Sequence, residues 1–398
     1  MTGNALPMSS TAMTRAHVFN GLAPMVAIVF FGFVAIAAPL AALSLELHDR
    51  LGFAPVVVGC VVGLQSVATL LTRHAGGSLS DVKGPRHAVL IGLPLTALAG
   101  AINLVSTSAL ISASGALALI LVGRLCMGFG ESLFITGAMA WGIARIGPQN
   151  TSKVMSWQGV AMYGAIGIGA PLGLAVQRSF GFSGVALVSI VTPMLAWAVA
   201  LACLGVPGGG GDRVPFYRVI GLIWRPGLVV TLAAAPFAAL TAFVALDYAD
   251  HGWTGAGLAL AGFGFCYVLV RLLFSHWPDR FGGIRITGIT LCLEAAGQAL
   301  LWLAPSPAFA FAGACLTGLG FSLVFPSMGV EAMRQVSPDQ RGRAVGNFIA
   351  FFDLAIGFTA PIVGLVAGRF GFQTAFLIGM GAALLAASLV PGVRRGTA

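Results

Sequence analysis

Two residues of opposite charge, Arg124 and Glu131, lie seven positions apart within the apolar stretch 114–143. Two turns of an α-helix return to nearly the same face, so both side chains would lie on one side of a helix, separated by about 10 Å along its axis. A carboxylate in such a stretch could exchange a proton or bind a cation, with the arginine tuning its charge. The alternative is a static buried ion pair that joins two helices.

Two further carboxylates interrupt apolar stretches. Asp353 lies about ten residues into the stretch 344–368, and Glu294 lies near the middle of 284–304. For Asp353 the residues leave a coupling role and a structural role equally open. For Glu294 the favoured interpretation is a hydrogen bond to an adjacent helix, although we keep it as a candidate coupling residue.

A cluster of charges and glycines follows the second apolar stretch. Its members are Arg73, Gly77, Asp81, Gly84 and Arg86. A carboxylate at a helix end, stabilised by the helix dipole and by nearby arginines, could act as a latch that holds one conformation and releases another. Candidate partners for Asp81 are Arg73, Arg86 and Asp279. The alternative is a solvated loop that only fixes the orientation of the chain.

The composition identifies the solvent around these residues as lipid. Of 398 residues, 58% are hydrophobic and only 8% are charged, and the mean hydropathy is +0.95. Soluble domains carry roughly 25% charged residues. The composition therefore excludes a soluble enzyme, a nucleic-acid-binding domain and a secreted disulfide scaffold as descriptions of the whole chain.

Twelve apolar stretches are long enough to cross a bilayer as helices, which takes about 20 residues each. They are 20–45, 54–74, 87–106, 114–143, 154–177, 182–205, 226–248, 254–275, 284–304, 308–333, 344–368 and 372–391. We therefore predict an all-α membrane protein.

Lys and Arg residues predict the orientation of the spans. Seventeen of them fall in the segments on the side of both termini, against three, Arg50, Arg178 and Arg369, on the other side. In membrane proteins the cytoplasmic segments are enriched in Lys and Arg. Both termini are therefore predicted to be cytoplasmic, and the net charge of +9 needs no nucleic-acid partner.

The run Pro207-Gly-Gly-Gly-Gly211 predicts a boundary between two six-span halves, 1–206 and 226–398, joined by a cytoplasmic linker, 207–225. The halves repeat. A shift of 190 aligns 165–182 with 355–372, with nine of eighteen positions identical, and places Pro171 on Pro361. These two prolines predict matching helix kinks around a cavity, or otherwise close helix packing.

A second shift, of 198 residues, relates the ends of spans 2 and 8. It places Arg73, Asp81 and Gly84 on Arg271, Asp279 and Gly282. Parallel repeats of six spans are typical of two bundles that surround a central site.

Three segments resemble motifs of one family. The run GSLSDVKGPR at 77–86 resembles the loop 2–3 signature of the major facilitator superfamily, ILVGRLCMGFG at 120–130 resembles its span 4 motif, and GAPLG at 169–173 is similar to part of its span 5 antiporter motif. The chain also resembles the bacterial YhhS-type branch at 64–76, 169–173 and 320–330. Pro85, at a position that is often basic, and Ala170 and Leu174, in the span 5 segment, depart from the family patterns.

The resemblance implies a monomeric secondary transporter of the bacterial inner membrane that moves a small molecule by alternating access. With Arg124, Glu131, Asp353 and Glu294 as candidate coupling or substrate residues, we expect proton-coupled export, without a cofactor, metal ion or enzymatic activity. A proton-coupled uptake symporter is the first alternative, and a transporter-derived sensor or scaffold is the second. The substrate is left open because fold does not fix function.

Overall fold

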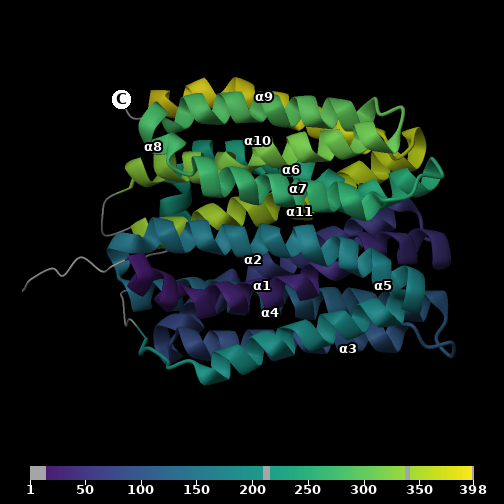
Figure 1. Ribbon diagram of the computed structural model, residues 1–398, viewed down its shortest axis with the longest axis horizontal. Coiled ribbons are helices and arrows are strands. Elements are labelled where there is room, and N and C mark those ends of the chain that lie inside the picture. Colours follow the sequence, from purple (N-terminus) through teal and green to yellow (C-terminus); the bar gives the residue numbers. More distant parts are fainter. Residues whose placement is uncertain (1–14, 209–215, 337–340, 397–398) are drawn as a thin grey trace, which may run out of the picture.

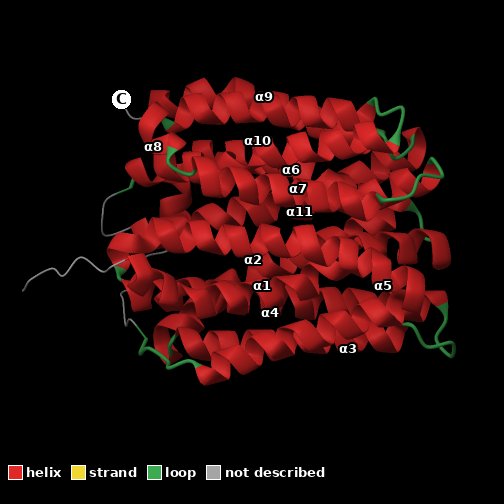
Figure 2. Ribbon diagram, viewed as in Figure 1, coloured by secondary structure: helices red, strands yellow, loops and turns green. Residues whose placement is uncertain are grey.

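The computed structural model describes residues 15–208, 216–336 and 341–396, and every regular element in these ranges is a helix (Figure 2). The long helices are α1 (Arg15–Leu45), α2 (Pro55–Lys83), α3 (Pro85–Ser106), α4 (Ala113–Ile146), α5 (Thr151–Ala202), α6 (Phe216–Asp250), α7 (Ala256–Phe274), α9 (Gly283–Trp302), α10 (Pro307–Arg334), α11 (Arg341–Phe370) and α12 (Thr374–Leu389). Helix α8 (Trp277–Phe281) is a single short turn between α7 and α9.

Eleven described segments are long and apolar enough to cross a membrane, and one of them contains two spans. The segment Lys153–Ala202 has 50 residues, or about 75 Å of helix against a hydrocarbon core of about 30 Å. Gly181 inside it has φ 67° and ψ −172°, a conformation that glycine tolerates and that breaks the helix. Residues 153–202 thus supply spans 5 and 6, and the predicted twelve-span, all-α fold is confirmed.

Two predicted boundaries differ from the structure. Helix α2 continues to Lys83 instead of ending near residue 74, so Asp81 lies in its last turn and not in a loop. Helix α6 begins at Phe216, so the second part of the predicted linker is helical. Residues 209–215 of that linker lie outside the described residues. Gly84, with φ 92°, allows the sharp turn from α2 into α3.

The helices run side by side along the long axis of the molecule, with α1–α5 on one side and α6–α12 on the other (Figure 1). We call the end where α1 begins and the chain finishes the termini end, and the opposite end the far end. The two groups meet where α2 packs on α11, α5 packs on α7 and α1 packs on α6. These three contacts bring together residues from opposite halves of the sequence.

Candidate functional site

A polar network lies in the interior, near the middle of three long helices. It consists of Gln65, Thr69 and Arg73 from α2, Arg124 and Glu131 from α4, and Asp353 from α11. We refer to these six residues as the interior polar network.

Gln65 connects the two charged residues of α4. Its Nε2 donates a hydrogen bond of 2.8 Å to Glu131 Oε2, and its Oε1 accepts one from Arg124 Nη1. Arg124 is 1% exposed, and Glu131 is half-buried. Both residues face the interior, as predicted from their spacing, but they are linked through an amide rather than by a direct ion pair.

Thr69 is a second polar neighbour of the Glu131 carboxylate. Its hydroxyl lies 3.3 Å from Glu131 Oε2, 3.1 Å from the carbonyl oxygen of Gly128 and 3.0 Å from that of Gln65, so its one proton has three possible acceptors. A Cβ built on Gly128 would lie 2.3 Å from the carbonyl oxygen of Gln65, so a larger residue would separate α2 from α4. Glycine at this position keeps the two helices close enough for the network to form.

An ion pair joins the two groups of helices inside the network. Arg73 of α2 donates two hydrogen bonds to Asp353 Oδ2 of α11, from Nε over 2.9 Å and from Nη2 over 2.5 Å. The two side chains are only 10% and 6% exposed. Both charged groups also lie within electrostatic reach of Glu131.

Other predicted site residues lie away from this network. Glu294 of α9 is fully buried, and neither of its oxygens has a hydrogen-bond partner among the described residues. It packs against the backbone of α10, where a Cβ on Gly320 would lie 2.6 Å from the Glu294 backbone nitrogen. The expected hydrogen bond to a neighbouring helix is therefore absent from the described part of the chain.

The partners expected for Asp81 are engaged elsewhere or lie apart from it. Arg73 is two turns deeper in α2 and pairs with Asp353, whereas Arg86 donates to the carbonyl oxygens of Ala200 and Leu201. Asp279, in α8, is exposed, as is Asp81. The described residues show no ion pair for either carboxylate. Within the described ranges, no latch contact to Asp81 occurs in this conformation, and its gating role stays a prediction.

Pro171 and Pro361 occupy equivalent places in the contacts between the two groups. Pro361 packs against Gly59 and Gly63 of α2, and Pro171 packs against Gly257 of α7. Neither proline coincides with non-helical dihedral angles; the break reported in α5 lies at Gly181. Each proline thus makes the close packing contact that the alternative predicts, and the helix kinks stay a prediction.

Glycines bring the backbones of the two groups into direct contact. A Cβ built on Gly63 would lie 2.6 Å from the carbonyl oxygen of Gly357, and one on Gly264 would lie 2.4 Å from the Cα of Gly167. Side chains would not fit at these distances, because they are shorter than any ordinary Cβ contact. The α2–α11 and α5–α7 contacts thus depend on glycine.

A cluster of six aromatic rings lies at the α5–α7 contact. It consists of Tyr163 of α5, Phe237 of α6, Phe263 and Tyr267 of α7, Phe321 of α10 and Phe352 of α11. Tyr163 stacks on Tyr267 with ring centroids 3.7 Å apart, and both are buried. This aromatic cluster joins one residue of the first group to five of the second.

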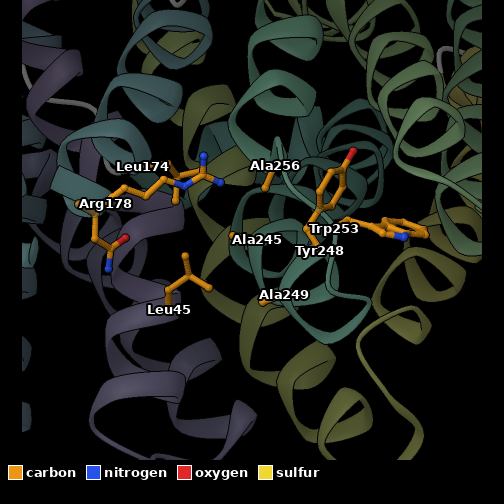
Figure 3. A pocket seen from close by; sticks show the side chains of 9 residues that line it. Leu45, Leu174, Arg178, Ala245, Tyr248, Ala249, Trp253 and Ala256 are labelled. Carbon is orange, nitrogen blue, oxygen red and sulfur yellow. The ribbon is translucent and has the colours of Figure 1, made fainter.

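A pocket of about 300 Å³ opens at the far end, between α5, α6 and the start of α7 (Figure 3). Its wall contains the guanidinium of Arg178 and the rings of Tyr248 and Trp253, with small and aliphatic residues between them. It lies between the two groups of helices but does not include any residue of the interior polar network.

The comparisons with known proteins agree with this architecture. The family model of the Major Facilitator Superfamily matches residues 22–254 and 229–396. The chain belongs to the major facilitator superfamily. It is therefore a multi-pass membrane transporter and not an enzyme, as expected from its motifs.

Full-length relatives and solved structures support the same assignment. The chain is 40% identical over 389 residues to an uncharacterised MFS-type transporter of Salmonella typhimurium, covering 97% of this chain and 98% of that protein. It is 41% identical to one of Pseudomonas aeruginosa over 96% of this chain and 95% of the relative. These names do not test the YhhS-type likeness, which stays a prediction.

Two solved structures share the fold of this superfamily member. A mutant of the nucleoside transporter NupG matches with a TM-score of 0.75 at 14% identity, over 94% of this chain and 100% of that chain. An inward-facing, occupied bacterial homologue of the human lysosomal transporter Spinster matches with a TM-score of 0.73 at 14% identity, over 96% of this chain and 98% of that chain. At these identities the likeness concerns the fold.

Sequence reasoning singled out Arg124, Glu131 and Asp353, and it named Arg73 as a latch residue near Asp81, but it did not predict that α2 residues connect these charges. Gln65, Thr69 and Arg73 follow one another at intervals of four, which places them on one face of a helix. A polar stripe at this spacing along an apolar helix was the available signal. The pairing of Arg73 with Asp353 joins residues 280 positions apart, and no local pattern predicts it.

Proposed function

We propose that this transporter exports a small organic molecule and that protons drive the export through the interior polar network. The halves 1–206 and 226–398 would move against each other about the linker 207–225, with a central site opening alternately to each side. The observation that carries the proposal is the Arg73–Asp353 ion pair, which crosses between the halves within electrostatic reach of Glu131.

The charges of the network suggest how a proton would act. With both carboxylates ionised, Arg73 and Arg124 balance Glu131 and Asp353. A proton on Asp353 would remove the partner of Arg73, and the α2–α11 contact would lose its buried ion pair. Protonation of Glu131 would change the electrostatic potential at the Arg73–Asp353 ion pair. Proton binding would thereby shift the equilibrium between a conformation in which the halves are in contact at the far end and one in which they are separated there.

The orientation follows from the positive-inside rule. The basic segments lie at the termini end, so we place that end in the cytoplasm and the far end outside the inner membrane. Asp81 and Asp279, exposed at the termini end, remain candidate gating residues for the opposite conformation, together with Gly77, Gly84, Arg86 and Arg271. We expect the protein to act as a monomer.

Inside-out membrane vesicles test the direction and the coupling. A gradient with an acidic interior is imposed and followed with a pH-sensitive dye while cations, sugars, amino acids and organic acids are added one at a time. Export by antiport predicts that one class dissipates the gradient. Uptake of the same class with a proton into whole cells would instead indicate the symporter and overturn the proposed direction.

Gly63→Val is expected to hold the far end open. The added side chain would overlap the backbone at Gly357, and overpacking typically costs about 1–3 kcal/mol, enough to raise the open population roughly tenfold. Labelling of Ala245→Cys, at the buried wall of the far-end pocket, by a membrane-impermeant maleimide reports the change. The native cysteines are replaced beforehand.

The matched control is Gly288→Val, because a Cβ at Gly288 would meet no atom within 4 Å. That variant should label at the parental rate. Equal labelling of the Gly63 variant and the parent would show that the close approach of α2 and α11 does not control the far end.

A further inference from the structure

The internal repeat pairs the interior polar network with the aromatic cluster. The shift of 198 places Gln65, Thr69 and Arg73 on Phe263, Tyr267 and Arg271, and the shift of 190 places Glu131 on Phe321 and Tyr163 on Asp353. In each case except that of Arg73, a charged or polar network residue corresponds to a residue of the aromatic cluster. Only the arginine is kept in both. The two arrangements occupy equivalent places in the fold but offer different chemistry.

Arg271 lacks the carboxylate that its counterpart has. Arg73 pairs with Asp353, whereas the position equivalent to Asp353 opposite Arg271 is Tyr163. Arg271 is 4% exposed, and its Nη1 donates to the carbonyl oxygen of Ser322 over 2.9 Å. Its Nε is buried and has no hydrogen-bond partner among the described residues. No ion pair to Arg271 occurs in the described ranges. A buried guanidinium in a membrane protein is costly without a counter-charge.

We propose that Arg271 binds the anionic group of the transported molecule and that the aromatic cluster receives its ring or apolar body. The substrate class is then a small organic anion, a carboxylate or phosphonate attached to a flat or apolar group. Arginine donates to such groups through several N–H groups in one plane, and stacked rings favour flat partners. This inference rests on the proposed transport function and assigns its substrate class.

Movement of the two halves would uncover this site. Arg271 of α7 packs against α5, because a Cβ built on Gly159 would lie 3.3 Å from its Nη2. Tyr163 of α5 stacks on Tyr267 of α7. Separation of α5 from α7 withdraws Gly159 and Tyr163 together. The far-end pocket lies on the same contact and also combines an arginine, Arg178, with aromatic rings (Figure 3). The membrane potential, negative inside, would favour the exit of an anion from the cell.

Titration calorimetry on the full chain in lipid nanodiscs tests the site without a gradient. The probes are benzoate, phenylphosphonate and 2-naphthoate, each compared with its uncharged amide or ester. We expect at least one anion to bind about tenfold or more tightly than its neutral counterpart, as a charge-assisted hydrogen bond implies. Tyr163→Asp places beside Arg271 the carboxylate that Asp353 provides for Arg73, and it should abolish that preference.

Matched variants distinguish the effect of a new negative charge at position 163 from the effect of a smaller side chain there. Tyr163→Asn, of nearly the same size as the Asp variant, should retain the preference for the anion. Arg271→Gln should lose it, which provides a second test if the Asp variant does not fold, and Arg178→Gln should retain it. Equal binding of anions and neutral counterparts by the parent would overturn the proposal. So would loss of the preference in Arg178→Gln alone, because the anion would then bind in the far-end pocket.

The outcome is independent of proton coupling. Anion binding that depends on Arg271 would stand even if Glu131→Gln left proton movement unchanged, a result that would remove only the proposed coupling. Conversely, proton-coupled transport of a neutral or cationic molecule would leave the proposed function in place and remove the assignment of an anionic substrate.

Discussion

Glu131→Gln is expected to lower proton-coupled transport by about 100-fold, within the range of known coupling free energies between sites, while substrate exchange without a gradient stays close to the parental rate. The amide keeps the size of the side chain and can still hydrogen-bond with Gln65 and Thr69, which now contact the carboxylate. It cannot release a proton. Proteoliposomes loaded with a pH-sensitive dye measure the coupled flux, and radiolabelled counterflow measures exchange.

Glu294→Gln is the matched control for this experiment. It makes the same change in a fully buried carboxyl that contacts neither the network nor an ion-pair partner among the described residues. We expect its coupled flux to remain within about twofold of the parental value, as for substitutions remote from a coupled site. Full proton flux in Glu131→Gln, or loss of flux in Glu294→Gln alone, would contradict the assignment of Glu131.

Asp353→Ala is expected to reduce the free energy of unfolding by about 3 kcal/mol or more, since it leaves Arg73 buried without its partner. The same loss should open the far end, because the pair holds α2 against α11. Arg73→Met combined with Asp353→Leu removes both charges and should recover most of the stability. It should not recover coupled transport. Unfolding in detergent measures stability, and the dye assay measures flux.

A variant in which Arg73 and Asp353 exchange places tests whether the two side chains stabilise the protein by interacting with each other. Arg73→Asp combined with Asp353→Arg restores an ion pair of opposite direction, and we expect stability above that of either single variant. If the two single substitutions prove additive in the double variant, the residues do not interact energetically and the pair does not hold the halves together.

The fold could be predicted from the sequence because lipid imposes strict rules on it. Apolar stretches of bilayer length, the bias of Lys and Arg and the repeat at shifts of 190 and 198 gave twelve spans and their grouping. Helix ends were less accurate. The segments that extend α2 to Lys83 and begin α6 at Phe216 carry charged residues such as Lys83 and Arg218, and in such segments hydropathy does not distinguish helix from loop.

The interior site was predicted only in part. Arg124, Glu131 and Asp353 are conspicuous because charge is rare in apolar stretches. Their partners depend on how helices pack, and packing is set by distributed contacts such as Gly128 against α2 and Gly63 against α11. The same holds for Arg73, which was assigned to a latch near Asp81 from its sequence neighbours. Its partner is on a helix of the other half.

The distance between the two halves at the far end, measured as a function of pH, tests the central claim most directly. Spin labels at Ala109→Cys and Thr254→Cys, both exposed and on opposite groups, report it by electron–electron resonance in nanodiscs without a substrate. His251 also lies at this end, beside Asp247, so the measurement is repeated with His251→Gln. If protons act through the network, acidification from about pH 8 to about pH 5 lengthens the distance in the parent and in the His251 variant, but not in Glu131→Gln combined with Asp353→Asn. A pH response that persists in that double variant, or that disappears with His251→Gln alone, would contradict the account.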